Sequence, residues 1–185
     1  QSENNFIYYV LGKKERHTLA DYVTGVEETS TNKIVLYSSA QTGKTTELKQ
    51  LCWELQQSGL YLPVSFEVRT NTKLKRDDLP ESQYVDGREV VLVIDALDEV
   101  NGQKYEDLLE EIGGYAYEHP EMKMVLSYRS NFRRERQLEL FTELFLEELS
   151  IDDARDYAAK REVNSDRFMR SVFANQLEDF IKNPF

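Results

Sequence analysis

The segment from Lys33 to Thr46 constrains the fold more than any other part of this sequence, because a short polar loop there joins two strongly patterned stretches. The apolar run from Ile34 to Tyr37 predicts a buried strand. After the loop, apolar side chains recur three and four residues apart, which predicts an amphipathic helix. These side chains belong to Leu48, Leu51, Cys52 and Leu55. A strand, a loop containing Gly43-Lys44-Thr45 and a helix, in this order, are what a phosphate-binding P-loop requires.

The predicted loop supplies inward-turned backbone N–H groups and a helix N-terminus, and both attract anions. We expect Lys44 to reach the β- and γ-phosphates of a nucleotide and the Thr45 hydroxyl to bind Mg²⁺. The residues predicted to line the nucleotide are Ser39, Ala40, Gln41, Thr42, Gly43, Lys44, Thr45 and Thr46. The alternative is a solvated loop that happens to contain Gly-Lys-Thr.

One position departs from the P-loop pattern. The pattern GxxxxGK[ST] begins with glycine, where this chain has Ser38. Glycine eases the turn out of the strand because it lacks a Cβ atom. Serine is also small, so we expect a weakened loop rather than an absent one.

Composition limits the possible functions. The 185 residues fit one α/β domain, or one domain with a small appendage. The net charge of −11 argues against non-specific nucleic-acid binding, which depends on contacts to phosphates. One cysteine excludes a disulfide framework and is compatible with a reducing compartment. The sequence shows neither a signal peptide nor an apolar run of the ~20 residues that span a bilayer. We therefore expect a cytoplasmic protein.

Strands that alternate with helices predict the fold class. The apolar run from Glu89 to Ile94 is rich in β-branched residues and predicts a strand that is buried on both faces, as in parallel sheets. The alternation predicts a three-layer α/β/α sandwich with a mostly parallel sheet. Ligands bind at the carboxyl ends of such strands. Three motifs fall there: Ser38 to Thr45, Asp95 to Glu99, and Ser127 to Arg129.

The chain divides into three predicted parts. Residues 1–32 form an N-terminal prelude, which either covers an adenine ring or simply packs against the core. Residues 33–149 form the P-loop core, and residues 150–185 begin a helical subdomain. Among the later elements we expect a helix over residues 131–140, an edge strand or extended segment over residues 144–149 and one last helix over residues 165–181.

Acidic residues follow the strand that ends at Ile94. A carboxylate at the end of an apolar strand suits Mg²⁺, and we expect Asp95 to serve the metal, either directly or through an intervening ligand. Hydrolysis also needs a group that orients or deprotonates a water. Asp98 and Glu99 are the candidates, and we slightly favour Glu99. The alternative is that both are ordinary solvated acids at the start of a loop.

A cation follows the next predicted strand. Arg129 follows the apolar run that ends at Ser127, with Tyr128 between them. A strand-end arginine can sense a γ-phosphate, and a charge-assisted contact of this kind is worth roughly 1.5–3 kcal/mol. That energy is enough for two conformations to prefer different nucleotides. The alternative is a surface arginine.

Together these motifs resemble those of a known family. The segments SSAQTGKTTELKQL, VVLVIDALDEV and KMVLSYRS resemble a NACHT domain of the STAND class of P-loop NTPases, which are AAA+-like and NLR-like signalling ATPases. The Asp-Ala-Leu-Asp-Glu stretch is the most specific feature. The last residues, Asn183-Pro184-Phe185, are similar to the family's Asn-Pro-Leu motif, whose proline approaches the adenine.

The resemblance implies a switch controlled by ATP and ADP with Mg²⁺. In this family ADP holds a closed monomer, and ATP with a trigger allows self-oligomerisation. Effector and sensor domains lie outside the ATPase, and known roles include innate immunity and antiphage defence. The resemblance also implies that the sequence, which stops at Phe185, is a piece of a longer protein. The implied site residues are Lys44 and Thr45 for phosphate and Mg²⁺, Asp95 for the metal, Asp98 or Glu99 for the water, Arg129 for the γ-phosphate and Pro184 for the base.

Three functional hypotheses follow. The first is a regulatory switch that binds and slowly hydrolyses ATP, which the presence of Lys44, Asp95 and Glu99 favours. The second is a degenerate P-loop domain that acts as an interaction scaffold without turnover, for which Ser38 is the only indication. The third is an AAA-type motor acting on nucleic acid, against which the acidic charge argues.

Overall fold

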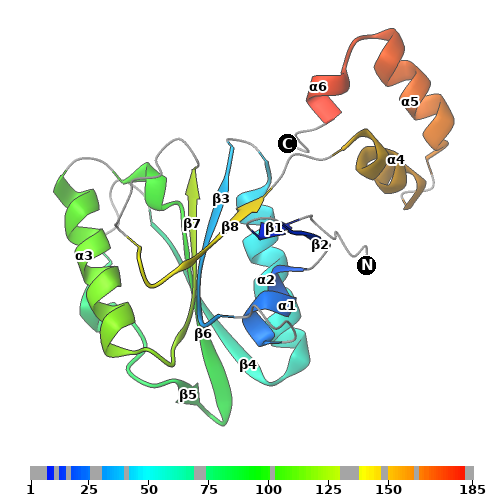
Figure 1. Ribbon diagram of the computed structural model, residues 1–185. Coiled ribbons are helices and arrows are strands. Elements are labelled where there is room, and N and C mark those ends of the chain that lie inside the picture. Colours follow the sequence, from blue (N-terminus) through cyan, green and yellow to red (C-terminus); the bar gives the residue numbers. More distant parts are fainter. Residues whose placement is uncertain are drawn as a thin grey trace.

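The computed structural model describes residues 8–10, 13–15, 18–25, 31–39, 42–68, 74–100, 103–129, 138–146, 150–160 and 163–181. Within these ranges one eight-stranded sheet is flanked by helices on both faces (Figure 1). The strands are β1 (Tyr8–Val10), β2 (Lys13–Glu15), β3 (Lys33–Ser38), β4 (Tyr61–Glu67), β5 (Tyr84–Val85), β6 (Arg88–Asp95), β7 (Lys123–Arg129) and β8 (Thr142–Leu146). The helices are α1 (Leu19–Thr24), α2 (Lys44–Ser58), α3 (Gln103–Glu118), α4 (Ile151–Lys160), α5 (Ser165–Ala174) and α6 (Glu178–Ile181), with short 3-10 helices η1 (Arg76–Asp78) and η2 (Leu97–Glu99).

The sheet is mostly parallel, which confirms the predicted fold class. Its order is β2-β1-β8-β3-β7-β6-β4, with β5 paired to β6. The strands β8, β3, β7, β6 and β4 run parallel to one another, whereas β1 and β2 are antiparallel additions at one edge. Strand β7 lies between the P-loop strand β3 and the strand β6 that ends at Asp95. All three predicted motifs therefore reach the same edge of the sheet.

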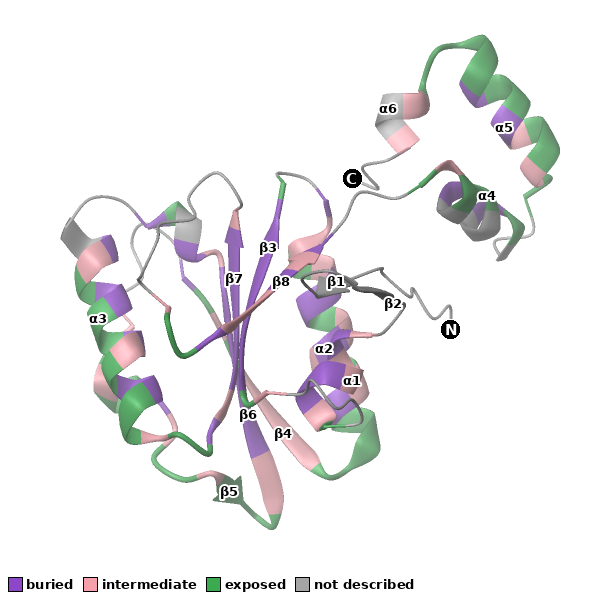
Figure 2. Ribbon diagram, in the orientation of Figure 1, coloured by how far each residue is buried: buried purple, intermediate pink, exposed green. Residues whose placement is uncertain are grey.

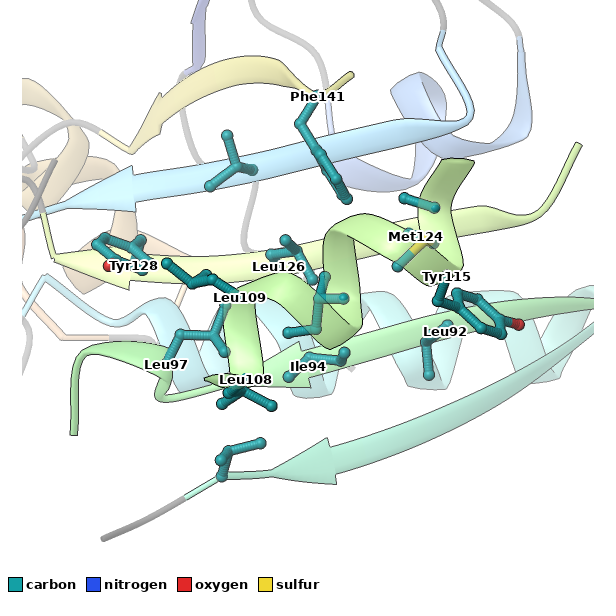
Figure 3. Close-up of a cluster of buried hydrophobic side chains, with 14 of the residues drawn as sticks. Leu92, Ile94, Leu97, Leu108, Leu109, Tyr115, Met124, Leu126, Tyr128 and Phe141 are labelled. Atoms are coloured by element: carbon teal, nitrogen blue, oxygen red, sulfur yellow. The ribbon is translucent and has the colours of Figure 1, made fainter. Parts of the chain in front are cut away.

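Alternation along β6 places its side chains in two separate cores. Leu92 and Ile94 pack against α3 on one face, together with Leu126 of β7 (Figure 3). Val91 and Val93 point to the other face, toward the core that contains α1 and α2. The central strands are accordingly buried on both sides (Figure 2). Since a fully buried Val, Leu or Ile contributes about 1.5–3 kcal/mol, this strand anchors the fold and fixes where Asp95 emerges.

The amphipathic helix predicted after the P-loop is α2. Helix α2 buries Leu48, Leu51 and Leu55 against the sheet, as their spacing predicts. It ends at Ser58, and Gly59 closes it in the left-handed conformation with φ 70°. Cys52 lies on the same side of the helix and is half-buried, and burial raises the pKa of its thiol.

Strand β8 corrects the prediction of an edge strand over residues 144–149. It spans Thr142–Leu146 and lies inside the sheet, parallel to β3 on one side and antiparallel to β1 on the other. Leu144 is fully buried. The prediction was wrong because β1, from the N-terminal segment, covers the edge that β8 would otherwise expose. Residues 147–149 lie outside the described residues.

The prediction of one helix over residues 165–181 was also wrong. The segment forms α5 and α6, separated by a turn. The Asn175 side chain donates a hydrogen bond to the Ser171 carbonyl at 2.7 Å and so competes with the helical backbone pattern. Gln176 then adopts φ 55°, which ends the first helix. Of the predicted helix over residues 131–140, residues 131–137 lie outside the described residues and residues 138–140 form a turn.

The helices α4, α5 and α6 pack together, away from the sheet (Figure 1). Their contacts bury Ala154, Ala158, Met169 and Val172. Across the part of the chain that the structure describes, none of the helices has the length and apolar character needed to cross a membrane.

Candidate phosphate and metal site

The carboxyl ends of β3, β7 and β6 lie side by side and form the candidate site (Figure 1). In the parallel register Ser38 of β3 is opposite Arg129 of β7. Ile94 of β6 is opposite Leu126. The loop after β3, the acids after β6 and the arginine that ends β7 are therefore neighbours, although long stretches of sequence separate them.

The turn into α2 depends on Gly43. This residue has φ 91° and ψ 17°, a left-handed conformation that costs a residue with a Cβ roughly 1–2 kcal/mol. Gly43 also has no side chain with which to cap the helix, and its carbonyl accepts the first helical bond, from Glu47 N at 2.9 Å. The N–H groups of the first turn face the loop, and the residue before the helix has no side chain to cap them, as suits an anion site.

The beginning of the loop is braced by two hydroxyl groups. Ser38 Oγ and Thr42 Oγ1 each donate a hydrogen bond of 2.9 Å to the Ser39 carbonyl. Ser38 is buried and is the last residue of β3, with extended backbone. This position does not need a left-handed conformation, so serine fits where the pattern has glycine. Ala40 and Gln41 lie outside the described residues.

Thr45 and Asp95 meet directly. Thr45 Oγ1 donates a hydrogen bond of 2.8 Å to Asp95 Oδ2, across 50 residues of sequence. Asp95 is buried, whereas Thr45 is exposed at the start of α2. A hydroxyl and a carboxylate oxygen beside a helix N-terminus are hard donors of the kind that Mg²⁺ takes together with phosphate. The donor set therefore fits the expected metal, with Thr45 and Asp95 as the residues that would hold it.

The other Asp95 oxygen is occupied by the protein. Oδ1 accepts hydrogen bonds from the Ala96 N–H at 2.8 Å and from the Ser127 hydroxyl. Ser127 is fully buried on β7. Ser127 belongs to a predicted strand-end motif, but no role was predicted for its side chain. Its signal was a polar residue in an otherwise apolar buried strand, because a buried hydroxyl needs a hydrogen-bond partner.

Glu99 and Arg129 also lie together. Arg129 Nη2 is 3.8 Å from Glu99 Oε1, and both side chains are partly exposed. Glu99 reaches this position because Ala96 turns the chain with φ 64°, after which η2 carries it back toward β7. An ion pair as exposed as this one is weak, so a ligand can compete for either member.

The remaining predicted residues are placed as follows. Lys44 opens α2 with a partly exposed side chain, and Thr46 follows it in the first turn. Ser39 is exposed at the end of β3. The side chain of Asp98 and the whole of Pro184 lie outside what the structure describes.

Comparison with known proteins identifies no family for this chain. No protein-family model matches the sequence, and no curated protein matches it. Solved structures do match, among them a closed-state cryo-EM reconstruction of Hsp104 with ATPγS and FITC-casein. That match has a TM-score of 0.49 and 15% identity, and it covers 69% of this chain. It covers 25% of the Hsp104 chain, so this sequence spans about a quarter of that protein.

The class of the fold rests on the chain's own architecture. A mostly parallel sheet, helices on both faces and a strand–loop–helix unit with a left-handed glycine at the carboxyl edge describe a P-loop NTPase-like fold.

Proposed function

We propose that this chain binds ATP and ADP with Mg²⁺ and hydrolyses ATP slowly, as the regulatory switch of a NACHT-type signalling ATPase. The observation that carries the proposal is the 2.8 Å hydrogen bond from Thr45 Oγ1 to Asp95 Oδ2. It joins the first turn of the P-loop helix to the acid that ends a buried central strand. An ordinary solvated loop that happens to contain Gly-Lys-Thr would not require a contact with a buried carboxylate.

Binding relies on the start of α2. The N–H groups at the start of α2 attract the phosphates, and Lys44 adds a positive charge to the same place. Thr45 and Asp95 would hold Mg²⁺, which when bound would neutralise charge on the phosphates. Pro184 and the N-terminal prelude are the proposed contacts of the adenine. The helices α4 to α6 are the proposed start of a helical subdomain.

Hydrolysis relies on residues at the neighbouring strand ends. Glu99 orients the attacking water and accepts its proton, with Asp98 as the alternative. Arg129 contacts the γ-phosphate and stabilises the charge that develops on it. A partly exposed site is consistent with slow turnover, which suits a switch better than a motor.

The contact between Glu99 and Arg129 suggests how the switch distinguishes nucleotides. The two side chains are 3.8 Å apart in this conformation. The γ-phosphate of ATP competes with Glu99 for Arg129, whereas ADP has no such group. ATP therefore releases Glu99 and draws Arg129 toward the nucleotide. The resemblance to NACHT domains supports the further proposal that this change controls self-oligomerisation and an effector, in innate immune or antiphage signalling.

Thermal unfolding with ATP, ADP or no nucleotide, each with and without Mg²⁺, tests the proposal. A ligand at 100 times its Kd adds about 2.7 kcal/mol to the free energy of unfolding. For a domain of this size the expected Tm rise is roughly 5–11 °C. The rise should disappear in Lys44→Ala and persist in Lys49→Ala, which changes an exposed lysine on the same helix. No shift at millimolar nucleotide in the wild type would overturn the proposal.

Turnover needs its own measurement. Phosphate release should be slowed in Glu99→Gln, with nucleotide binding retained. If Lys44→Ala releases phosphate as fast as the wild type, the hydrolysis does not depend on this site. That result would remove the catalytic assignment and favour a scaffold that does not hydrolyse ATP. If Asp98→Asn rather than Glu99→Gln abolishes turnover, Asp98 is the base.

A further inference from the structure

The hydroxyl of Ser127 lies in a buried network around the Asp95 carboxylate. Ser127 is fully buried. Its hydroxyl donates a hydrogen bond to Asp95 Oδ1 and accepts one from the Ala96 N–H at 3.1 Å. The same N–H is 2.8 Å from Asp95 Oδ1. The Asp95 carboxylate, the Ala96 N–H and the Ser127 hydroxyl therefore form hydrogen bonds with one another, and the serine is shielded from solvent.

The strand register explains why these groups meet. Ile94 of β6 is opposite Leu126 of β7, so Asp95 and Ser127 follow directly on the paired strands. Val93 and Val125, two residues earlier, both face the α2 core. Because side chains two apart on a strand share a face, Asp95 and Ser127 point toward α2 as well. That direction brings the carboxylate to Thr45.

The two oxygens of the Asp95 carboxylate have different hydrogen-bond partners. Oδ1 is held by Ser127 and by the Ala96 N–H, whereas Oδ2 is directed at Thr45 Oγ1 at 2.8 Å. Without the serine, Oδ1 would keep only the backbone bond from the adjacent residue. That bond restrains the carboxylate less, because the donor belongs to the next residue of the same turn. The second donor comes from another strand and fixes the plane of the carboxylate against the sheet.

We propose that Ser127 is a positioning residue, which orients Asp95 Oδ2 toward Thr45 and thereby sets the affinity of the site for a divalent cation. The inference rests on the proposed function, since it concerns the same site. Residues that orient a metal ligand typically change metal affinity by 10–100-fold when they are removed. The affinity for the phosphates themselves depends on the P-loop and does not pass through Ser127.

Mn²⁺, which replaces Mg²⁺ at oxygen sites, provides a direct probe. The free Mn²⁺ signal in electron paramagnetic resonance measures the Kd of Mn²⁺ in the presence of saturating ADP, and titration in EDTA measures the Kd of ADP without metal. Ser127→Ala should raise the Kd of Mn²⁺ by about 10–100-fold and leave the metal-free Kd of ADP unchanged. Ser127→Thr keeps the hydroxyl and should bind Mn²⁺ as the wild type does. Ser65→Ala, at an exposed serine of β4, is the matched control.

The outcomes separate the inference from the proposed function. A Ser127→Ala variant that binds Mn²⁺ like the wild type, even with a lowered Tm, would show a merely structural serine and overturn the inference alone. A wild type that binds neither ADP nor Mn²⁺ would overturn both. If Ser127→Ala does not fold, Ser127→Cys replaces the hydroxyl by a weaker donor of similar shape. Weakened Mn²⁺ binding in Ser127→Cys, beside unchanged binding in Ser127→Thr, would support the inference, and equal binding in both would overturn it.

Discussion

Arg129 Nη2 lies 3.8 Å from Glu99 Oε1, so the residue proposed to sense the γ-phosphate contacts the residue proposed to activate the water. The two side chains come from different strand ends, and each has access to solvent. An exposed ion pair contributes at most about 1 kcal/mol. This energy is too small to hold the site closed but large enough to bias the nucleotide preference.

Glu99→Gln should therefore raise the affinity for ATP relative to ADP, by at most about fivefold, because the Glu99 charge no longer competes with the γ-phosphate for Arg129. Isothermal titration calorimetry of both nucleotides with Mg²⁺ measures the ratio. Glu110→Gln, at an exposed glutamate of α3, is the control and should leave it unchanged. If Glu99→Gln instead loses all nucleotide binding, Glu99 is a metal or phosphate contact and its assignment as the base is wrong.

Gly43→Ala should destabilise the chain by about 1–2 kcal/mol, because φ at this position is 91° and a Cβ atom opposes that conformation. The expected fall in Tm is roughly 2–8 °C. Gly113→Ala provides the contrast: this glycine is inside α3, and nothing lies within 4 Å of an added Cβ. Alanine there should stabilise the helix by about 0.5–1 kcal/mol. Equal effects of the two substitutions would mean that the loop does not hold Gly43 in the left-handed conformation.

Local patterns were enough to predict the parallel core and the edge of the sheet at which the site lies. The apolar runs in β3, β6 and β7 are long and uninterrupted, and such segments are buried whatever their partners. The P-loop could be located because glycine, lysine and threonine occur at fixed offsets between a strand and a helix. These patterns do not predict the order of the strands. Parallel neighbours are not joined by a short turn, so the local sequence does not indicate which strands pair.

Features that depend on distant contacts were missed for the same reason. The inner position of β8 follows from its pairing with β1, for which no local signal exists. Lys33 begins β3 and is buried, which the local sequence pattern does not predict. Its Nζ donates hydrogen bonds to the carbonyls of His119 and Pro120 at 3.0 and 2.9 Å. The left-handed turn at Ala96 was equally invisible, because alanine rarely adopts φ 64° and carries no sign of it.

We expect the free energy of unfolding to fall at high pH because Tyr115 loses its proton there. Burial, with a smaller contribution from the charge of Glu121, raises the pKa of Tyr115 from 10.0 to about 12, although Arg76 opposes this shift. The folded chain thus keeps the phenol protonated at a pH where the unfolded chain has lost the proton. The stabilisation is fully present below about pH 10 and is lost as the pH rises toward 12, by at most about 1.4 kcal/mol per pH unit.

Denaturant titrations at pH 9, 10, 11 and 12 measure this dependence. Tyr115→Phe should be less stable than the wild type at pH 9, since it loses the 2.8 Å hydrogen bond from the Tyr115 hydroxyl to the Pro80 carbonyl. The difference between the two proteins should then shrink as the pH rises. Tyr117→Phe, at an exposed tyrosine of the same helix, should keep a constant difference from the wild type. A difference for Tyr115→Phe that stays constant up to pH 12 would contradict the raised pKa.

Thr45→Val should remove the dependence of nucleotide binding on Mg²⁺, because valine keeps the shape of threonine and lacks the hydroxyl that meets Asp95 at 2.8 Å. Valine also leaves Asp95 Oδ2 without its threonine donor, so a loss of about 1–3 kcal/mol in the free energy of unfolding should accompany the change. Thr45→Ser restores the hydroxyl and should restore both properties.

Thr142→Val, at the start of β8, tests whether the loss of any strand-end hydroxyl has the same effect. Calorimetry measures the affinity of each variant for ADP with Mg²⁺ and in EDTA. A Thr45→Val variant that still binds ADP more tightly with Mg²⁺ would show that the metal does not use this hydroxyl.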